Sequence, residues 1–242
     1  MSYKLLIREH ELNKVKKYFT TNKKVLEIGG GNGHQASIIK SWGSEIISID
    51  VEINHNEKYF EVKKYDGINL PFSNDSFDII YSSNVLEHVK DLDLLIRETK
   101  RVIKPKGVII HLIPSSSWRF WTILAHYPYL IIRLFNMIFV KEKKIKNENI
   151  ENLKLTSKPV NFISKFFPQP HGEFSSAITE LFYFSKFYWK KKFLSHDLKI
   201  EKIEDNEIFY TGYHLLKYHF KKIRFIMSKI IGGSCNIFFL RK

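Results

Sequence analysis

Short apolar segments alternate with segments of helical periodicity along the first half of the chain. Apolar runs of strand length occur at residues 25–28, 45–49, 60–65, 78–81 and 108–113. Residues 34–41 and 92–102 have the hydrophobic spacing of helices. This alternation of strands and helices predicts an α/β fold.

The second half contains a long insertion before the next predicted elements. Residues 115–178 separate the strand at 108–113 from a helix predicted at 179–194. A strand at 198–203, a helix at 214–231 and a last strand at 236–240 complete the predicted order. The insertion follows the C-terminal end of a central strand, where open α/β sheets bind ligands. We therefore expect it to form a lid over the substrate.

A glycine-rich turn follows the first apolar run, and residues 25–33 read Val-Leu-Glu-Ile-Gly-Gly-Gly-Asn-Gly. Because glycine has no Cβ, Gly29, Gly31 and Gly33 permit a tight turn and a close approach of the backbone to a ligand. The helix at 34–41 points its amide N–H groups at this turn. A dinucleotide fingerprint needs G-x-G-x-x-G, and here the third glycine comes one residue early. The turn predicts a cradle for a different nucleotide-like cofactor.

Several motifs follow the glycine loop in a specific order. They are Asp50 after the second run, Asp66 before Leu70-Pro-Phe72, the Phe77-Asp78 strand start, Asn84-Val-Leu-Glu-His-Val89 and Arg101-Val-Ile-Lys-Pro-Lys-Gly107. Together with Glu27-x-Gly29-x-Gly31-x-Gly33, they resemble the type 11 branch of class I S-adenosylmethionine (SAM)-dependent methyltransferases. The resemblance is close over residues 23–113. Lys106 departs from it, because glycine is usual at that position in the family.

This resemblance implies a Rossmann-like fold with a seven-stranded, mostly parallel sheet, an antiparallel last strand and helices on both faces. A helical insertion would follow strand 5, and an added helix would lie between strands 6 and 7. SAM would be the cofactor, with Glu27 near its ammonium group, Asp50 at the ribose hydroxyls and Asp66 at the adenine amino group. The other expected cofactor contacts are Gly29, Gly31, Val51, Gly67, Asn84 and His88, with Gly33, which would serve mainly in helix packing.

Length and composition fit one α/β domain of 242 residues. We divide it into a leading helix (1–22), a cofactor-binding half (23–114), the insertion (115–178) and a C-terminal part (179–242) with an added helix at 213–231. The leading helix either covers the cofactor or only packs on the sheet. The single cysteine, Cys235, excludes an internal disulfide and indicates a reducing, cytoplasmic compartment.

The net charge of +14 favours a polyanionic partner. Two segments combine apolar and basic residues, which suits an anionic membrane surface. Residues 118–140 are apolar and aromatic, but polar residues and Pro128 interrupt them, so they fail as a transmembrane span. In the helix at 214–231, Lys217, Lys221 and Arg224 share one face. The alternatives are ordinary buried helices with solvated basic ends, or an RNA-binding groove, although no known RNA-binding module is present.

Methyl transfer from a sulfonium is an in-line displacement, so positioning can supply most of the catalysis. A hydroxyl acceptor also needs a base with a pKa near neutral, and histidines supply it most readily. We rank His171 and His126 in the insertion above His111 in the fifth strand, with a structural role as the alternative for each. Some relatives, including methyltransferases of quinone precursors and of small RNA, hold a divalent ion with Glu-x-x-Glu-His. Asn84 replaces the first glutamate here, so we predict no metal.

The segments around Trp118, Pro168-Gln-Pro-His-Gly172 and 180–189 look like those of methyltransferases of surface-polysaccharide pathways. We therefore expect methylation of a hydroxyl on a saccharide or lipid-linked saccharide. The protein would be cytoplasmic and peripheral on the inner face of the membrane. The alternatives are a quinone-like or lipid-like acceptor, and an RNA methyltransferase or RNA-binding protein.

Overall fold

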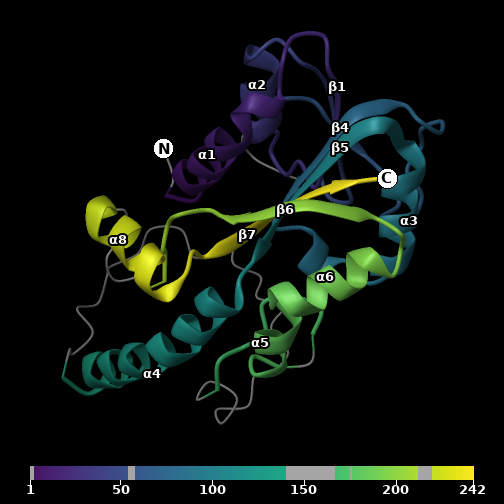
Figure 1. Ribbon diagram of the computed structural model, residues 1–242. Helices are drawn as coiled ribbons and strands as arrows, with labels where there is room; N and C mark the ends of the chain where they lie inside the picture. The colour runs from purple at the N-terminus through teal and green to yellow at the C-terminus, as the bar shows by residue number, and fades with distance from the viewer. Residues whose placement is uncertain (1–2, 54–57, 140–166, 175, 212–219) are drawn as a thin grey trace.

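The computed structural model describes residues 3–53, 58–139, 167–174, 176–211 and 220–242 (Figure 1). Seven strands form one sheet in the order β3-β2-β1-β4-β5-β7-β6. The strands are β1 (Lys24–Ile28), β2 (Glu45–Asp50), β3 (Val62–Lys64), β4 (Phe77–Ser83), β5 (Ile103–Pro114), β6 (Lys199–Asp205) and β7 (Cys235–Arg241). The helices are α1 (Tyr3–Val15), η1 (Lys16–Tyr18), α2 (His34–Ser41), η2 (Leu86–His88), α3 (Leu92–Val102), α4 (Ser116–Phe139), α5 (Thr179–Tyr183), α6 (Lys186–Leu194) and α8 (Lys221–Ile231).

The pairing of the strands confirms the predicted topology. β1 pairs in parallel with both β2 and β4, and β4 pairs in parallel with β5. β7 runs antiparallel to both of its neighbours, β5 and β6. The strand order reverses between β1 and β4, which places a ligand crevice at the carboxyl ends of these two strands.

Helices cover both faces of the sheet, as predicted (Figure 1). On one face, Leu12 and Val15 of α1 and Ile39 of α2 pack with Tyr81 of β4. On the other, residues of α3 and α6, including Leu95, Ile96, Trp189 and Phe193, form a second cluster. Adjacent strand residues alternate between the clusters, because side chains along a strand point to opposite faces.

Some element boundaries differ from the prediction. The third strand is limited to Val62–Lys64, and β5 begins at Ile103 rather than at 108. The single helix predicted at 179–194 is two helices, α5 and α6. Ser185 separates them in an extended conformation, and its hydroxyl accepts the N–H of Tyr188 at 3.1 Å to cap α6.

The insertion begins as a helix, α4, directly after β5. Residues 140–166, with the basic run at 141–146, lie outside the described residues. Among the helices that the structure describes, none combines the length and the apolar composition needed to cross a bilayer.

The added helix between β6 and β7 is α8, which begins at Lys221 after Phe220 in a left-handed conformation, later than the predicted start. Residues 212–219, including Lys217, lie outside the described residues. The prediction that Arg224 belongs to an exposed basic face was wrong. Arg224 is buried, and its Nη1 donates to the carbonyl of Phe209 at 2.9 Å.

Candidate functional site

The glycine loop links β1 to α2 at the point where the strand order reverses. Its shape leaves no room for side chains on the sheet side, since a Cβ at Gly30 would lie 1.9 Å from Ser48 Oγ. Gly31 has a φ of +55°, and a Cβ there would meet nothing within 4 Å. The loop is therefore closed toward the sheet and open on its outer side, as a cofactor cradle requires. Gly33 packs against the backbone of Phe60, which supports a packing role.

Two carboxylates flank the loop from adjacent strands. Asp50 ends β2, and its Oδ2 accepts the N–H of Gly31 at 2.7 Å. Glu27 lies in β1, where it is buried and accepts the hydroxyl of Ser48 at 2.5 Å. Burial raises the pKa of Glu27 to about 7. A cationic group bound at the loop would favour the charged form of this carboxyl.

The expected adenine region lies beyond β2 and β3. Val51 and Ile68 are exposed apolar side chains, and a Cβ at Gly67 would lie 3.0 Å from Val51. Asp66 closes the turn here, because its Oδ1 accepts the N–H groups of Ile68 and Asn69, both at 2.8 Å. These backbone hydrogen bonds lower the pKa of Asp66. Asp66 therefore stabilises this turn, and its contact with adenine stays a prediction.

A pocket of about 390 Å³ lies next to the loop. Asn84, at the end of β4, is part of its wall, and the neighbouring Val85 packs against Gly29. The other walls come from α1, α4, the turn at 168–172 and the segment after β6. The lining residues are Tyr3, Lys4, Ile7, Arg8, Asn84, Trp118, Thr122, His171, Tyr210 and Thr211. Its place beside the loop makes it the candidate acceptor site.

His171 is the predicted base that the structure places in this pocket. Its ring centre lies 4.9 Å from that of Trp118 and 5.1 Å from that of His88. Partial burial, with further effects of His88, Arg119, Arg8 and Lys4, lowers the pKa of His171 to about 4. The imidazole is therefore neutral near pH 7 and can accept a proton.

The turn that carries His171 is held by a buried ion pair. Glu180 of α5 is fully buried, and its Oε1 accepts the N–H groups of His171 at 2.6 Å and Gly172 at 2.7 Å. Its other oxygen lies 2.7 Å from Nε of the buried Arg119 of α4. Arg119 Nη2 also donates to the carbonyl of Gln169 at 2.5 Å. Two helices of the second half thus fix the position of His171.

Glu87 and His88 of η2 lie behind this turn. The ligand atoms of Glu87, His88 and His171 are all within 4.8 Å of one another, so they have the donor types of a divalent metal site. Burial raises the pKa of Glu87 to about 8, and neither of its carboxyl oxygens accepts a hydrogen bond from another described residue. A protonated Glu87 is a poor ligand, although a bound cation would favour its ionised form.

The other two candidate bases do not line the pocket. His111 is buried in the core, where Nδ1 lies 2.7 Å from Ser82 Oγ and the ring stacks on Phe193. This burial lowers the pKa of His111 to about 3. The expectation of a base at His111 is corrected, because its ring faces the α6 side of the sheet. His126 lies further along α4, beside Tyr127.

The sequence did not predict several residues of the pocket. The leading helix α1 contributes four of them, which lie one turn apart: Tyr3, Lys4, Ile7 and Arg8. The sequence does not decide whether this helix covers the cofactor or only packs on the sheet. Tyr210 is brought to the pocket by β7, since its hydroxyl lies 3.1 Å from Cys235 Sγ. No local motif marks Tyr210, because its position depends on the packing of the two last strands.

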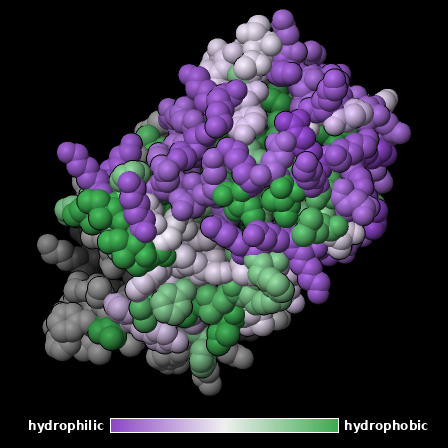
Figure 2. All heavy atoms as spheres, in the orientation of Figure 1, coloured by the Kyte–Doolittle hydropathy of each residue, from purple (hydrophilic) through white to green (hydrophobic). Residues whose placement is uncertain are grey.

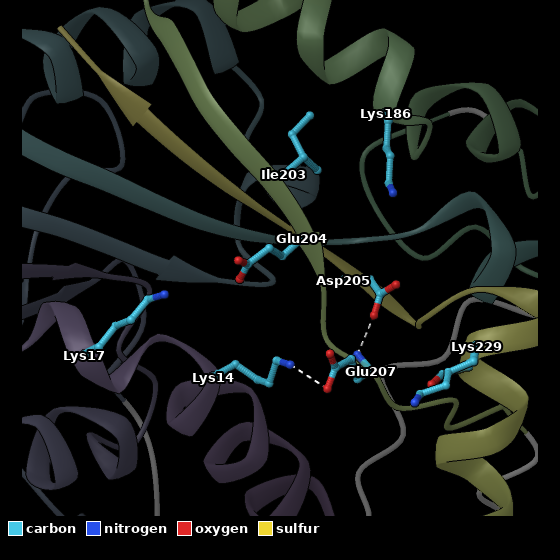
Figure 3. Close-up of a pocket in the computed structure, with 9 residues that line it drawn as sticks. Lys14, Lys17, Lys186, Ile203, Glu204, Asp205, Glu207 and Lys229 are labelled. Carbon is cyan, nitrogen blue, oxygen red and sulfur yellow. Dashed lines mark hydrogen bonds and ion pairs between the residues drawn. The ribbon is translucent and has the colours of Figure 1, made fainter.

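A second, more polar hollow of about 560 Å³ lies along the edge strand β6, away from the loop (Figure 3). Lysines and acidic residues alternate around it. Lys14 Nζ lies 2.6 Å from Glu207 Oε2, and the N–H of Glu207 donates to Asp205 at 2.7 Å. An ion pair and a backbone hydrogen bond join these residues, so the hollow resembles a solvated sheet edge rather than a catalytic site.

Comparison with solved structures supports the fold. A putative SAM-dependent methyltransferase from Listeria monocytogenes matches with a TM-score of 0.53 and 14% identity, over 99% of this chain and 98% of that chain. Geranyl diphosphate C-methyltransferase from Streptomyces coelicolor, solved with S-adenosyl-L-homocysteine, matches with a TM-score of 0.54 and 11% identity, over 97% of this chain and 80% of that chain. At these identities the likeness concerns the fold alone.

Comparison with known sequences identifies the family. A ubiquinone biosynthesis O-methyltransferase of Bartonella bacilliformis is 25% identical over 145 residues, which are 55% of this chain and 58% of that protein's length. An uncharacterised protein of Methanocaldococcus jannaschii is 30% identical over 193 residues, covering 77% of this chain and 76% of that protein. Residues 4–154 match the family described as a methyltransferase domain. The chain therefore belongs to the methyltransferase domain family, has the fold of SAM-dependent methyltransferases, and spans less than two thirds of the length of the Bartonella relative.

Proposed function

We propose that this methyltransferase acts on a hydroxyl of a saccharide or lipid-linked saccharide, with His171 as the base and without a metal ion. The observation that carries the proposal is the pocket that joins Asn84, beside the glycine loop, to Trp118 and the neutral His171. Trp118 and Tyr210 offer aromatic faces on which a sugar ring can stack. Lys4 adds a cationic group that suits an acidic sugar or a phosphate, whereas Arg8 is paired with the buried Glu11 at 2.7 Å.

The residues present fit SAM. The outer side of the loop is open at Gly31, Asp50 lies at the end of β2, and Glu27 is a buried carboxyl that accepts a hydrogen bond from the neutral hydroxyl of Ser48. SAM supplies an electrophilic methyl group and a neutral thioether leaving group. The pocket would hold the acceptor hydroxyl in line with the S–CH₃ bond. As the O–CH₃ bond forms and the S–CH₃ bond breaks, His171 would take the proton of the hydroxyl.

The first test is mass spectrometry of surface glycans and lipid-linked saccharides from cells with and without this gene. We expect one glycan to lose the mass of a CH₂ group, and a chain with His171→Ala to fail to restore it. The purified protein should then methylate the extracted, undermethylated acceptor equally well with and without EDTA. Unchanged glycans and lipids would contradict the proposed acceptor, and loss of activity in EDTA that Mg²⁺ restores would contradict the metal-free mechanism.

A quinone-like acceptor is the second candidate. Two relatives from Bartonella species are named as ubiquinone biosynthesis O-methyltransferases, at 25% and 24% identity. The substitution of asparagine for the first glutamate of the Glu-x-x-Glu-His motif, at Asn84, argues against this acceptor. The same pair of cell extracts distinguishes the two, because a demethylated quinone would accumulate in the second case.

The pKa of Glu27 predicts a pH-dependent affinity for SAM. If the SAM ammonium pairs with ionised Glu27, binding must remove the proton that Glu27 holds below pH 7. The affinity should therefore rise about tenfold per pH unit below about pH 7 and level off above it. Isothermal titration calorimetry between about pH 5.5 and pH 8 measures this slope. The Glu27→Gln variant should bind more weakly with a flat profile, and an equally steep slope in that variant would contradict the assignment.

A further inference from the structure

α8 is packed on the protein by its polar side. A surface helix ordinarily buries an apolar stripe and exposes its polar residues. In α8 the buried residues are Arg224 and Ser228. Arg224 donates to the carbonyls of Phe209 at 2.9 Å and Thr211 at 3.2 Å, whereas the hydroxyl of Ser228 donates within α8 to the carbonyl of Phe225 at 2.7 Å. Arg224 thus attaches the helix through hydrogen bonds, and three isoleucines of α8 are exposed.

The outward side of α8 is apolar with lysines beside it. Ile223, Ile226 and Ile230 are 52%, 56% and 77% exposed, and their spacing of three and four residues places them on one stripe. Lys222 and Lys229 are exposed next to this stripe, and Lys229 Nζ lies 4.5 Å from the ring centre of Phe225. Figure 2 shows this apolar patch over α8 with hydrophilic side chains at its border. We refer to these three isoleucines and two lysines as the α8 face.

The beginning of α4 lies against the end of α8 and also lines the acceptor pocket. Exposed apolar side chains recur along α4 at Phe120, Leu124, Tyr127 and Ile131. The two helices meet where Ser117 donates to the carbonyl of Ile231. Figure 1 shows both helices at the same end of the molecule. Trp118 and Thr122 of α4 also line the acceptor pocket.

We propose that the α8 face docks on an anionic lipid bilayer. Isoleucines at helical spacing bury their side chains at the acyl boundary, and the flanking lysines pair with anionic headgroups. The net charge of +14 adds long-range attraction to such a surface. The bilayer is favoured over a protein partner because cations border the apolar stripe of α8. Docking here would bring the pocket close to an acceptor carried on a lipid, and this last point alone rests on the proposed function.

Co-sedimentation with vesicles tests the proposal on the full chain. The vesicles are phosphatidylcholine alone and phosphatidylcholine with phosphatidylglycerol, at low and at high salt. We expect binding to the anionic vesicles that weakens with salt. The variant Ile223→Ser/Ile226→Ser/Ile230→Ser should reduce the bound fraction at least about tenfold, because it removes the inserted apolar area. Lys222→Glu/Lys229→Glu should abolish the preference for anionic vesicles.

A matched control removes three apolar side chains of similar exposure elsewhere, as Ile178→Ser/Phe187→Ser/Leu194→Ser. This control should bind vesicles as the wild type does, and circular dichroism and SAM binding should show that all variants are folded.

Equal loss of vesicle binding in both triple variants, or no vesicle binding by the wild type, would overturn the proposal. A dimer in sedimentation velocity that only the α8 variant dissociates, with no vesicle binding, would assign the face to a second copy instead. Since the vesicles contain no acceptor, failure of methyl transfer leaves this result unaffected.

Discussion

Replacement of His171 by alanine is expected to lower kcat about 100-fold while the affinity for SAM stays unchanged. A general base contributes roughly 10²- to 10⁴-fold, and the low pKa of His171, about 4, places it at the lower end of that range. The same pKa predicts the pH profile. Because the base must be unprotonated, the contribution of His171 to the wild-type rate should be constant from about pH 6 upward and should be lost only as the pH falls toward 4.

His126→Ala is the matched control for this prediction. His126 lies on α4 of the same half of the chain but does not line the pocket, so its removal should leave kcat within about twofold of the wild type. Single-turnover measurements with the identified acceptor separate the chemical step from product release. Equal rates for His171→Ala and the wild type would show that another group, or solvent, accepts the proton.

Replacement of Glu180 by alanine is expected to destabilise the protein by about 3–5 kcal/mol. The change leaves the buried Arg119 without its ion-pair partner, and it removes the acceptor of the His171 and Gly172 N–H groups. Loss of one partner of a buried pair costs more than the pair itself contributes, because the remaining charge stays desolvated. Urea unfolding of the apo protein measures the loss, and kcat should fall as well because the turn carrying His171 is released.

Glu201→Ala provides the comparison, since Glu201 pairs with Arg241 at the protein surface. A surface ion pair contributes about 1 kcal/mol or less, so this variant should unfold close to the wild type. The double variant Arg119→Ala/Glu180→Ala should lose less stability than the sum of the two single changes, because the residues act as a pair. Additive losses, or a stability of Glu180→Ala equal to that of Glu201→Ala, would contradict the role of the Arg119–Glu180 ion pair in holding the turn.

The cofactor half was predictable because its signals are local. The turn at Gly29 to Gly33 and the carboxylates at Glu27 and Asp50 lie at fixed distances from strand ends, and strand ends follow directly from apolar runs. The same reasoning predicted α2 and α3 with their observed bounds. The sheet order then followed from the family resemblance.

The acceptor side was less predictable because it depends on contacts between distant segments. The spacing of Arg224 suggests an exposed basic face. However, Arg224 donates to carbonyls of the segment after β6, and this side of α8 therefore packs on the protein. Tyr210 and Arg8 carry no motif and enter the pocket only through tertiary packing. His111 follows the alternation of β5, which points it into the core.

The contacts of Glu180 determine which segment of the chain can be exchanged between relatives to transfer substrate specificity. Glu180 lies in α5, beyond residue 178, where the sequence placed the end of the insertion. A chimera joined at 178 would take Arg119 and the 168–172 turn from one parent and their carboxylate from the other. The exchangeable unit is therefore residues 116–183. A library that recombines this unit whole should yield more folded enzymes than one that divides it.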